Sequence, residues 1–441
     1  MPIGLNASRF LPNHRIAAVC CCVLLSSCGD SGKEATTTRP DDHRQPGGTR
    51  LVLPTSEPIV RVRLESARDS GERIPIGDDG IQLGFELHDA SIGSSDGPVE
   101  IERRGHRWIV VHGGREIIDR DSREPLVISG SGPMPVGDRG SGSHRFSGTL
   151  HCIPHSNGSD DDWDLVEHVA MGDYIPGVLM GELYAGWTSS CFEAQAVAAR
   201  SYACMEIQMR SSRDWDVMAS PRSQAYIGAT DDRTALEARD ATRGLVLAWN
   251  DELVPGYFSS CCGGLAATAA LQISPSPVNR IPPLNGHDGP DPCTDSPLYS
   301  WKIERSASSL GDRLEAWAVS NSHRSLRRLT SLKSIQVHER NEHDRPTVLR
   351  ITDQGGRTAD LGIEEFLFAS NYDHDGPPSK NLWSGWSTGV VDRDRIVLHG
   401  RGFGHGVGLC QYGAQELGIR GKTFREILSW YYPGSSLHAA W

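Results

Sequence analysis

The feature that most constrains the fold of this 441-residue chain is a helical pattern whose buried face is mostly alanine. Phe192, Ala196, Ala199, Ala203 and Ile207 recur at the spacing of one face of an α-helix. Because alanine side chains are small, such a helix must lie very close to the elements that it packs against. We therefore expect one tightly seated helix around which the rest of the chain is arranged.

Local signals place the ends of this helix. Ser190 and Glu193 have the spacing of a capping box, which predicts a helix that begins at Ser190 and ends near Met209. The preceding segment, 174–187, is mostly apolar and reads as a turn. It carries a single carboxylate, Glu182, which we expect at the mouth of a loop, held against the rigid helix.

Outside this region the pattern is mostly that of β-strands. Val60, Val62 and Leu64 alternate with charged residues, and Ile81–Leu87 alternates in the same way. The 48 glycines and 26 prolines fit a fold with many turns. We predict an α+β fold: a strand-rich body with a few helices, an N-terminal β region and a small β-rich insertion.

The N-terminus has the pattern of an export signal. An apolar run, Ile16–Leu25, follows positively charged residues and is too short to span a bilayer. It ends in Leu25-Ser26-Ser27-Cys28, which resembles the bacterial lipobox, whose cysteine becomes the lipidated first residue. The alternative is an ordinary cleaved signal peptide. We expect an exported protein of the periplasm or cell envelope, anchored to a membrane through lipidated Cys28.

These patterns divide the chain into regions. Residues 1–28 form the signal peptide, and the polar residues 29–57 form a disordered tether. Residues 58–140 form the N-terminal β-rich region. Residues 141–435 form the main domain, with 302–395 as a smaller β-rich subdomain within it. The formal charge of −12 argues against nucleic acid as a partner, because phosphate binding requires clustered Lys and Arg.

Glu182 is the first candidate for chemistry. An apolar setting raises the pKa of a carboxyl group by desolvation, and Val178, Leu179 and Leu183 would supply such a setting. A carboxyl that keeps its proton near neutral pH can act as a general acid. The alternative is a surface glutamate in a loop, the commonest state of this residue type.

A glycine-rich segment, Gly400–Gly413, is the second candidate. Its glycines alternate with Phe403, His405 and Val407, and such alternation lets a backbone approach a ligand or another strand closely. His405 suits a hydrogen-bonding partner, a proton carrier or a metal ligand. The alternative is a tightly packed turn that contains a fully bonded histidine.

Scattered cysteines and histidines are the third candidate. Seven cysteines remain beyond the signal peptide and Cys28, and because this number is odd, at least one is outside any intramolecular disulfide. Zinc takes cysteine and histidine ligands. A disulfide is the alternative in an oxidising compartment. The candidate residues are Cys261, Cys262, His287, Cys293, His405 and Cys410.

Two stretches resemble the signatures of the stage II sporulation protein D (SpoIID) family, which includes the amidase enhancer LytB. The first is Tyr174-Ile-Pro-Gly-Val, then Gly181-Glu182-Leu, then Glu193-Ala-Gln-Ala-Val-Ala-Ala-Arg200-Ser-Tyr-Ala. The second is Gly402-Phe-Gly-His-Gly-Val-Gly-Leu-Cys-Gln-Tyr-Gly-Ala. The resemblance covers about residues 140–435.

The resemblance implies a peptidoglycan lytic transglycosylase that acts in cell-wall remodelling, division or sporulation. It would cleave the bond between N-acetylmuramic acid and N-acetylglucosamine in glycan strands stripped of their stem peptides, leaving 1,6-anhydro ends. Glu182 would be the catalytic acid/base, and Arg200, Tyr202, His405 and Gln411 would contact the substrate. The alternative is a non-catalytic, glycan-binding amidase enhancer that stimulates an N-acetylmuramoyl-L-alanine amidase.

The resemblance also implies a cofactor and partners. Family members can carry a zinc site near the cleft, which here implies structural Zn²⁺ held by Cys262, His287 and Cys293. Cys410 stands where the family commonly has serine, and it would join these ligands or form a disulfide. The implied partners are peptidoglycan glycan strands and a cell-wall amidase.

Overall fold

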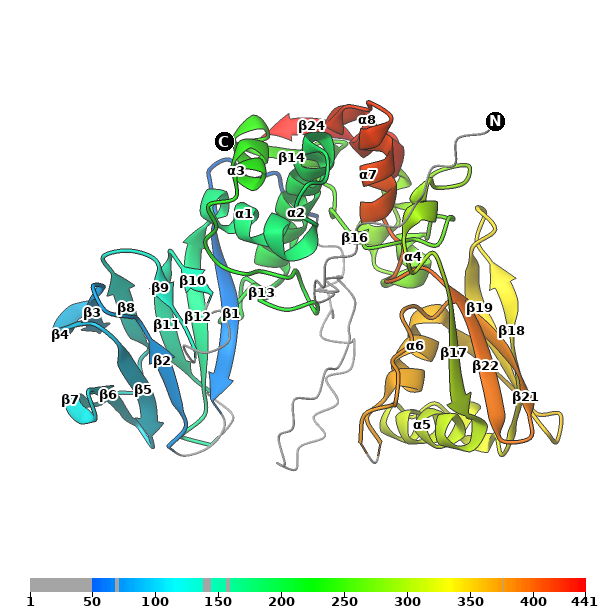
Figure 1. Ribbon diagram of the computed structural model, residues 1–441, viewed down its shortest axis with the longest axis horizontal. Helices are drawn as coiled ribbons and strands as arrows, with labels where there is room; N and C mark the ends of the chain where they lie inside the picture. The colour runs from blue at the N-terminus through cyan, green and yellow to red at the C-terminus, as the bar shows by residue number, and fades with distance from the viewer. Residues whose placement is uncertain (1–49, 68–70, 138–143, 156–158, 375) are drawn as a thin grey trace, which may run out of the picture.

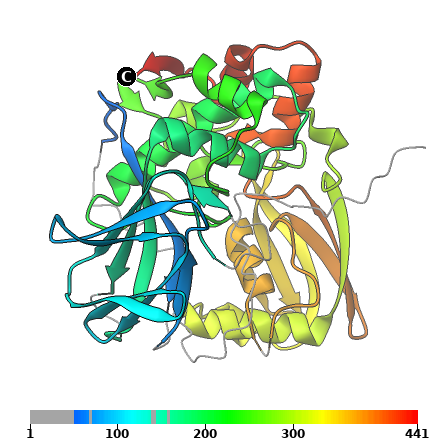
Figure 2. The same cartoon turned by 60° about the vertical axis from the view of Figure 1, so that its left-hand side comes forward.

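The computed structural model describes residues 50–67, 71–137, 144–155, 159–374 and 376–441. It has three parts: a β layer from the N-terminal half, a central helical layer, and a second β part from the C-terminal half (Figure 1). The two β parts lie side by side below the helices, as the turned view also shows (Figure 2). The signal peptide, Cys28 and residues 29–49 of the expected tether lie outside the described residues.

The first part packs a seven-stranded sheet against a four-stranded one. Trp108 of the smaller sheet and Trp163 of the larger meet edge to face, with ring centroids 5.6 Å apart. The larger sheet has the order β13-β1-β12-β11-β8-β3-β4, the smaller has the order β2-β5-β6-β7, and β9 pairs with β10. The bounds are β1 (Ile59–Ala67), β2 (Arg73–Ile76), β3 (Gln82–Leu87), β4 (Ala90–Asp96), β5 (Val99–Arg104), β6 (Arg107–His112), β7 (Arg115–Asp121), β8 (Leu126–Gly130), β9 (Met134–Pro135), β10 (Arg145–Phe146), β11 (Thr149–Pro154), β12 (Trp163–Ala170) and β13 (Val217–Met218).

Two boundaries in the structure differ from the predicted ones. β12 pairs along its whole length with β1, and β11 pairs with both β12 and β8, so the N-terminal sheet continues to Ala170 rather than stopping at residue 140. The tether also ends earlier than residue 57. Leu51 is 1% exposed and belongs to the main hydrophobic core, and the backbone of the exposed Val52 bridges to Glu252, so the folded body begins by Leu51.

The central layer is built around α2 (Ser189–Met209), which contacts α1, α3, α7, α8 and β14. The small buried residues of α2 allow these neighbours to approach it closely, as the alanine pattern predicted. The remaining bounds are α1 (Met171–Glu182), α3 (Arg233–Ala241), β14 (Leu245–Trp249), β15 (Glu252–Leu253), β16 (Phe258–Ser259), α4 (Ala269–Gln272), η2 (Pro277–Asn279), η3 (Pro282–Leu284), η4 (Cys293–Asp295), β23 (Leu409–Cys410), α7 (Gln411–Ile419), α8 (Phe424–Tyr431) and β24 (Ser436–Ala439).

The local structure around α2 differs from the prediction in two ways. The helix is capped by Thr188, whose Oγ1 accepts from the Cys191 backbone N–H, and not by a Ser190–Glu193 box. Its end at Met209 is as predicted. The segment expected as a turn is mostly helix: α1 continues directly from β12, contains Pro176, and ends at Glu182. Its glycines and proline gave it the composition of a turn.

The third part is an insertion into the central layer. Its six-stranded sheet has the order β17-β22-β21-β18-β19-β20, and with α5 and α6 it encloses a separate hydrophobic core. It spans Ser300 to Arg401, close to the expected 302–395. The bounds are β17 (Ser300–Ser306), α5 (Ala307–Ser320), η5 (Leu326–Arg328), β18 (Leu332–Arg340), β19 (Pro346–Asp353), β20 (Thr358–Gly362), α6 (Ile363–Asn371), β21 (Ser387–Asp392) and β22 (Arg395–Arg401).

The mixture of helices and strands confirms the α+β, strand-rich prediction. A short parallel pair, β16 with β23, brings residues 258–264 beside the glycine-rich segment. The bridges Cys261 to Phe403 and Ala267 to Val407 extend this contact. Among the described residues, none of the helices is both long enough and apolar enough to cross a membrane.

Candidate active site and thiol cluster

Glu182 is the last residue of α1, and its carboxyl group is enclosed by two other segments. Oε1 accepts a hydrogen bond from the Ala225 backbone N–H at 2.7 Å, and Oε2 accepts one from Gln411 Nε2 at 3.1 Å. The residue is only 3% exposed. Helix α1, the segment after β13 and the start of α7 therefore meet at this one carboxyl group.

Two glycines on one face of α1 make this enclosure possible. A Cβ atom at Gly181 would lie 2.4 Å from the Ala225 carbonyl oxygen, and one at Gly177 would lie 2.1 Å from that of Gly228. Real Cβ atoms do not come so close, so segment 224–228 can lie directly on α1 only because these positions lack side chains. Gly181 thus lets segment 224–228 lie close to α1, and this places the Ala225 N–H within hydrogen-bond distance of the neighbouring Glu182 carboxyl group.

Burial sets the protonation state of Glu182. Desolvation raises its pKa to about 7, and the hydrogen bonds from Ala225 and Gln411 oppose this rise in part. Neighbouring charges are not among the causes of the shift. The carboxyl group therefore keeps its proton up to near neutral pH, as a general acid must.

An aromatic cluster lies next to Glu182 and Gln411 in the chain. The Trp187 ring centroid lies 5.1 Å from that of Tyr412 and 5.4 Å from that of Tyr184. Tyr184 is 42% exposed, so the cluster presents an aromatic surface to solvent. Sequence reasoning did not identify Tyr184, Tyr412 or the Ala225 N–H as parts of the site. The two tyrosines could have been found from the sequence, because Tyr184 lies two residues after Glu182 and Tyr412 directly follows Gln411.

The four predicted substrate contacts lie in different surroundings. Gln411 contacts Glu182, as described above. Arg200 is 2% exposed and donates to the Leu245 carbonyl at 2.9 Å, so it joins α2 to β14 and is not available to a substrate. The Tyr202 ring packs edge-on against Tyr257 and Phe258, with centroids 6.1 and 6.4 Å away. Both side chains were expected at the site because they share the alanine-rich motif.

His405 has the surroundings of a structural histidine. Its Nδ1 accepts from the Val407 backbone N–H at 2.9 Å, and the residue is 8% exposed. Burial lowers its pKa to about 4, and the charge of Arg345 lowers it further. His405 is therefore neutral at physiological pH and holds the glycine-rich loop in shape, which agrees with the structural alternative for this motif.

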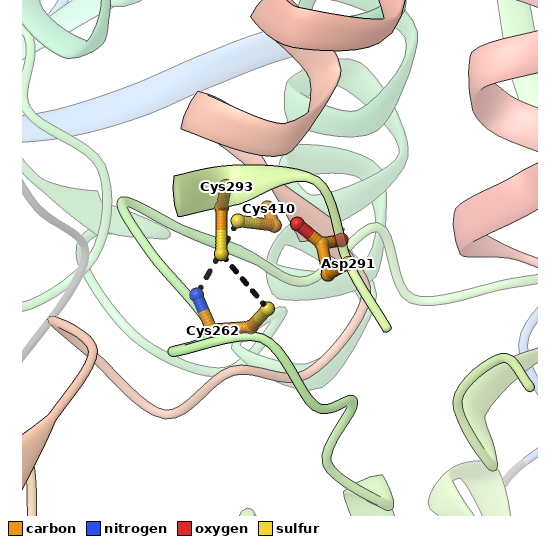
Figure 3. A group of neighbouring side chains, drawn as sticks. All are labelled: Cys262, Asp291, Cys293 and Cys410. Atoms are coloured by element: carbon orange, nitrogen blue, oxygen red, sulfur yellow. Dashed lines mark hydrogen bonds between the residues drawn. The ribbon is translucent and has the colours of Figure 1, made fainter. Parts of the chain in front are cut away.

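Three of the predicted metal ligands form a cluster. The Sγ atoms of Cys262, Cys293 and Cys410 and a carboxylate oxygen of Asp291 all lie within 4.8 Å of one another (Figure 3). The four residues are buried. Cys262 Sγ lies 3.6 Å from Cys293 Sγ, which is no disulfide, and the seven cysteines among the described residues are all free. Burial favours the thiol form of Cys262, but contacts with Cys293 and Cys410 lower its pKa to about 7.

The fourth predicted ligand, His287, is not in this cluster. Its Nε2 lies 3.4 Å from Asp291 Oδ2, so it contacts the carboxylate, and Asp291 takes the position expected for the histidine. The reason is local: the 3-10 turn after Pro292 places Cys293 beside Asp291, two residues away. The sequence signal for Asp291 was only this spacing.

The cluster fits a tetrahedral metal ion. Ligand atoms about 2.3 Å from zinc are separated by about 3.8 Å in a tetrahedron, close to the 3.6 Å between Cys262 and Cys293. Both carboxylate oxygens of Asp291 are buried without a hydrogen bond to protein, which a metal ion would remedy. His287 would then hold the carboxylate from outside, an arrangement common around metal ligands.

Arg345 of the insertion connects the thiol cluster with the glycine-rich loop. Its guanidinium group donates to the carbonyl oxygens of Cys262, Leu265 and His405, the last two at 2.8 and 3.2 Å. It is 1% exposed. Among the described residues no carboxylate lies within ion-pair distance of it. Desolvation lowers the pKa of Arg345, and Cys262, Glu364, Cys261 and Cys293 are the nearby groups whose negative charge opposes this shift.

Comparisons with known proteins agree with this architecture. Residues 159–249 match the family model of the stage II sporulation protein SpoIID. An uncharacterized protein of Brachyspira hyodysenteriae is 28% identical over 292 residues, which cover 66% of this chain and 71% of that protein.

Two relatives come from Bacillus subtilis. Its amidase enhancer is 26% identical over 60% of this chain, although the match spans only 40% of the enhancer. Its stage II sporulation protein D is 24% identical over 62% of this chain and 76% of that protein. The chain is thus similar to the SpoIID family over residues 159–249 and to both Bacillus subtilis proteins over about three fifths of its length.

Proposed function

We propose that this protein is a peptidoglycan lytic transglycosylase with Glu182 as its single catalytic acid/base. The observation that carries the proposal is the state of Glu182: a buried carboxyl, pKa about 7, fixed by Ala225 and Gln411. Similarity to the SpoIID family and to an amidase enhancer suggests peptidoglycan as the class of substrate. Cell-wall remodelling, division or sporulation is the process in which such an activity would serve.

In the proposed reaction one carboxyl group performs two proton transfers. Glu182 gives its proton to the glycosidic oxygen between N-acetylmuramic acid and N-acetylglucosamine as the bond to C1 breaks. The C6 hydroxyl of the muramic sugar then attacks C1, and the Glu182 carboxylate takes the hydroxyl proton. The products are a free N-acetylglucosamine end and a 1,6-anhydromuramic end. Hydrolysis would normally use a second carboxylate, and among the residues that the structure describes none bonds to Glu182 or affects its pKa.

Gln411 and the aromatic cluster suit two supporting roles. Gln411 Nε2 holds Oε2 in place and can stabilise the carboxylate formed after the first proton transfer. Tyr184, Trp187 and Tyr412 offer aromatic faces on which sugar rings can pack. Because Glu182 is 3% exposed, the substrate must displace neighbouring side chains to reach it.

The test is a digest of glycan strands stripped of stem peptides by an amidase, with mass spectrometry of the products. The wild-type protein is expected to release 1,6-anhydromuramic ends, and Glu182→Gln is expected to release none. Glu237→Gln, a change at an exposed carboxylate on α3, serves as the matched control and should leave product formation unchanged. Turnover by Glu182→Gln would rule out the assignment.

A non-catalytic amidase enhancer is the second candidate. The burial of Glu182 and the enhancer among the relatives favour it. In that case the wild-type protein and Glu182→Gln would stimulate an N-acetylmuramoyl-L-alanine amidase equally, and neither would release anhydro sugars. Measuring both activities on the same two proteins separates the candidates.

We also propose a structural Zn²⁺ held by Cys262, Cys293, Cys410 and Asp291. When bound, zinc would fix the segments 261–264 and 291–293 against the start of α7, whose first residue is Gln411. The thiol groups would bind as thiolates, and their negative charge would be balanced in part by Arg345. The metal would thus support the position of Gln411 without entering the reaction.

The location remains a proposal based on the N-terminal pattern. We propose that the protein is exported and held on a membrane of the cell envelope by lipidated Cys28. Cys28→Ala is expected to move the protein from the membrane fraction to the soluble exported fraction. Unchanged membrane association of that variant would contradict lipid anchoring at this residue.

A further inference from the structure

A cavity of about 480 Å³ lies on the insertion, where β17, β21 and β22 approach the glycine-rich loop. Lys302, His399 and Thr388 are partners across these three strands. Their neighbours Ile303 and Leu398 point into the core of the insertion. Because side chains alternate along a strand, this row faces away from that core, and Lys302 and His399 are exposed.

Arg401 is held rigidly at one end of this cavity. Its guanidinium group lies 4.7 Å from the centroid of the Tyr299 ring and 4.8 Å from that of Trp386. It donates one hydrogen bond, from Nη2 to the Tyr299 hydroxyl group. A guanidinium has five N–H donors, and among the described residues no other acceptor is bonded to this one. The remaining donors are therefore pre-positioned for a ligand.

The charges of this cavity are not neutralised by the protein. Among the described residues neither Arg401 nor Lys302 has a carboxylate within ion-pair distance. Glu304, which follows Lys302 on the same face of β17, is paired with Arg395 at 2.6 Å. In a chain of net charge −12, two unpaired cations beside a histidine and a tryptophan form a locally positive site. Such a site selects an anionic ligand.

We propose that this cavity binds a carboxylate of the peptidoglycan strand, with Arg401 and Lys302 as its recognition residues and Trp386 as the apolar wall. A planar guanidinium matches a carboxylate with paired hydrogen bonds, and the aromatic wall suits the sugar or peptide that carries it. The identity of the polymer rests on the proposed function. The carboxylate comes either from the lactyl group of a stripped muramic sugar or from a stem peptide.

The chain connects this cavity to Glu182. Arg401 is followed by the glycine-rich loop, and Gln411, ten residues later, bonds to Glu182. Even a fully extended segment of this length spans only about 35 Å, and the loop here is folded. A glycan strand long enough to span this distance would reach both places, and the cavity would then set which section of the strand lies at Glu182.

The test measures binding in the Glu182→Gln background, so that the polymer is not cut. The probes are amidase-stripped glycan strands, the same strands with their carboxyl groups reduced to alcohols, and the free stem peptide as competitor. Arg401→Gln and Lys302→Gln are each expected to weaken binding of stripped strands by about tenfold. Lys333→Gln, an exposed lysine on β18 of the same sheet, is the matched control and should change little.

The outcomes separate the two proposals. The site is supported if reduction of the carboxyl groups weakens binding to Glu182→Gln and no longer does so once Lys302→Gln is added. Competition by the free stem peptide then identifies which carboxylate the site takes. Equal binding of stripped and reduced strands without competition by the stem peptide, or no effect of Lys302→Gln on any of these measurements, overturns it. If binding behaves as expected but the wild-type protein releases no anhydro sugar, the proposed enzyme activity fails and the carboxylate site stands. Circular dichroism of Arg401→Gln checks that its ring contacts are not needed for folding.

Discussion

At the scale of single residues, Glu182 links burial to stability as well as to catalysis. Its pKa is about 7 in the folded protein and near 4.5 in the unfolded chain. Between these two values the folded state holds more protons than the unfolded state, so its stability falls as pH rises through this window. Above pH 7 the folded protein carries a buried carboxylate, which lowers its stability by up to about 3 kcal/mol.

This linkage predicts an opposite effect of Glu182→Gln on stability and on activity. The variant should lose activity at every pH, yet gain stability relative to wild type as pH rises from 5 to 8. Other buried carboxyls, Glu167 and Glu364, also have raised pKa values, so the difference between the two proteins is the quantity to measure. Urea unfolding at several pH values tests it. A difference that does not change with pH would contradict the raised pKa.

The same pKa predicts the pH dependence of the reaction. Because the first step needs protonated Glu182, kcat/KM for the release of anhydro ends should fall as pH rises through about 7. The profile is measured on stripped glycan strands over pH 5 to 9, with stability checked at each pH. A rate that keeps rising above pH 8 would show that another group supplies the proton.

Gly181 carries the third prediction. Gly181→Ala places a methyl group against the Ala225 carbonyl, so segment 224–228 must move away from α1 and the Ala225 N–H must leave Glu182. We expect a loss of about 1–3 kcal/mol in unfolding free energy and a large loss of activity. Gly172→Ala, on the same helix, meets only the end of the Glu57 side chain and is the control. Full activity of Gly181→Ala would show that the Ala225 bond is dispensable.

Sequence reasoning at this scale succeeded where a motif contains the site itself. Glu182 and Gln411 were both named, and they contact each other. Arg200 was named for the same motif but bonds to β14, because helical periodicity places it on a different face of α2 from the start of α7. Asp291 was missed because an isolated aspartate gives no local sign that Cys262 and Cys410, which are distant in the sequence, will join Cys293 beside it.

At the scale of elements, α1 was mistaken for a turn. Pro176, Gly177 and Gly181 are residues typical of turns, but here the glycines provide space for segment 224–228. The reason for these glycines is therefore a contact with a segment distant in the sequence, and the composition of 174–187 alone does not reveal that contact. The alanine pattern of α2 was informative because it repeats along a whole face of the helix and can be read from the local sequence.

Arg345 provides the prediction at this scale. Arg345→Met leaves the carbonyl groups of Cys262, Leu265 and His405 without this donor, at a cost of about 2–4 kcal/mol. We expect calorimetry to show one unfolding transition for the wild-type protein and two separate transitions, one for the insertion and one for the central layer, for Arg345→Met. Arg340→Met, on the exposed part of the same hairpin, is the control. A single unshifted transition would show that other contacts couple the two parts.

At the scale of the whole molecule, zinc is expected to join segments from three places in the chain. The purified protein should contain about one zinc per chain, and Cys262→Ser or Asp291→Asn should remove it and lower Tm. Cys204→Ser, at a buried thiol on α2, should keep the metal. If the protein instead lacks zinc and thiol titration finds two cysteines oxidised, a disulfide replaces the metal site.

The overall organisation was predictable in outline but not at its boundaries. Alternating strands, a central helix and an inserted β-rich subdomain were all visible in the pattern. The pairing of β12 with β1 was not, because it joins residues about a hundred positions apart and alternation does not encode the partner of a strand. The early start of the body at Leu51 was missed because the apolar run 51–53 is only three residues long and shows no period.

The insertion has one further consequence for how this chain can be altered. Ser300 and Arg401, where it leaves and rejoins the central layer, face each other across adjacent strands, so the gap between them is about 5 Å. Judged by the path of the backbone, residues 301–400 could be cut out and the ends joined. Judged by their contacts they could not, because Arg345 would leave with them, and with it the donor that holds Cys262 beside His405. The insertion could thus be removed without a break in the path of the backbone, yet the central layer depends on it for its structure.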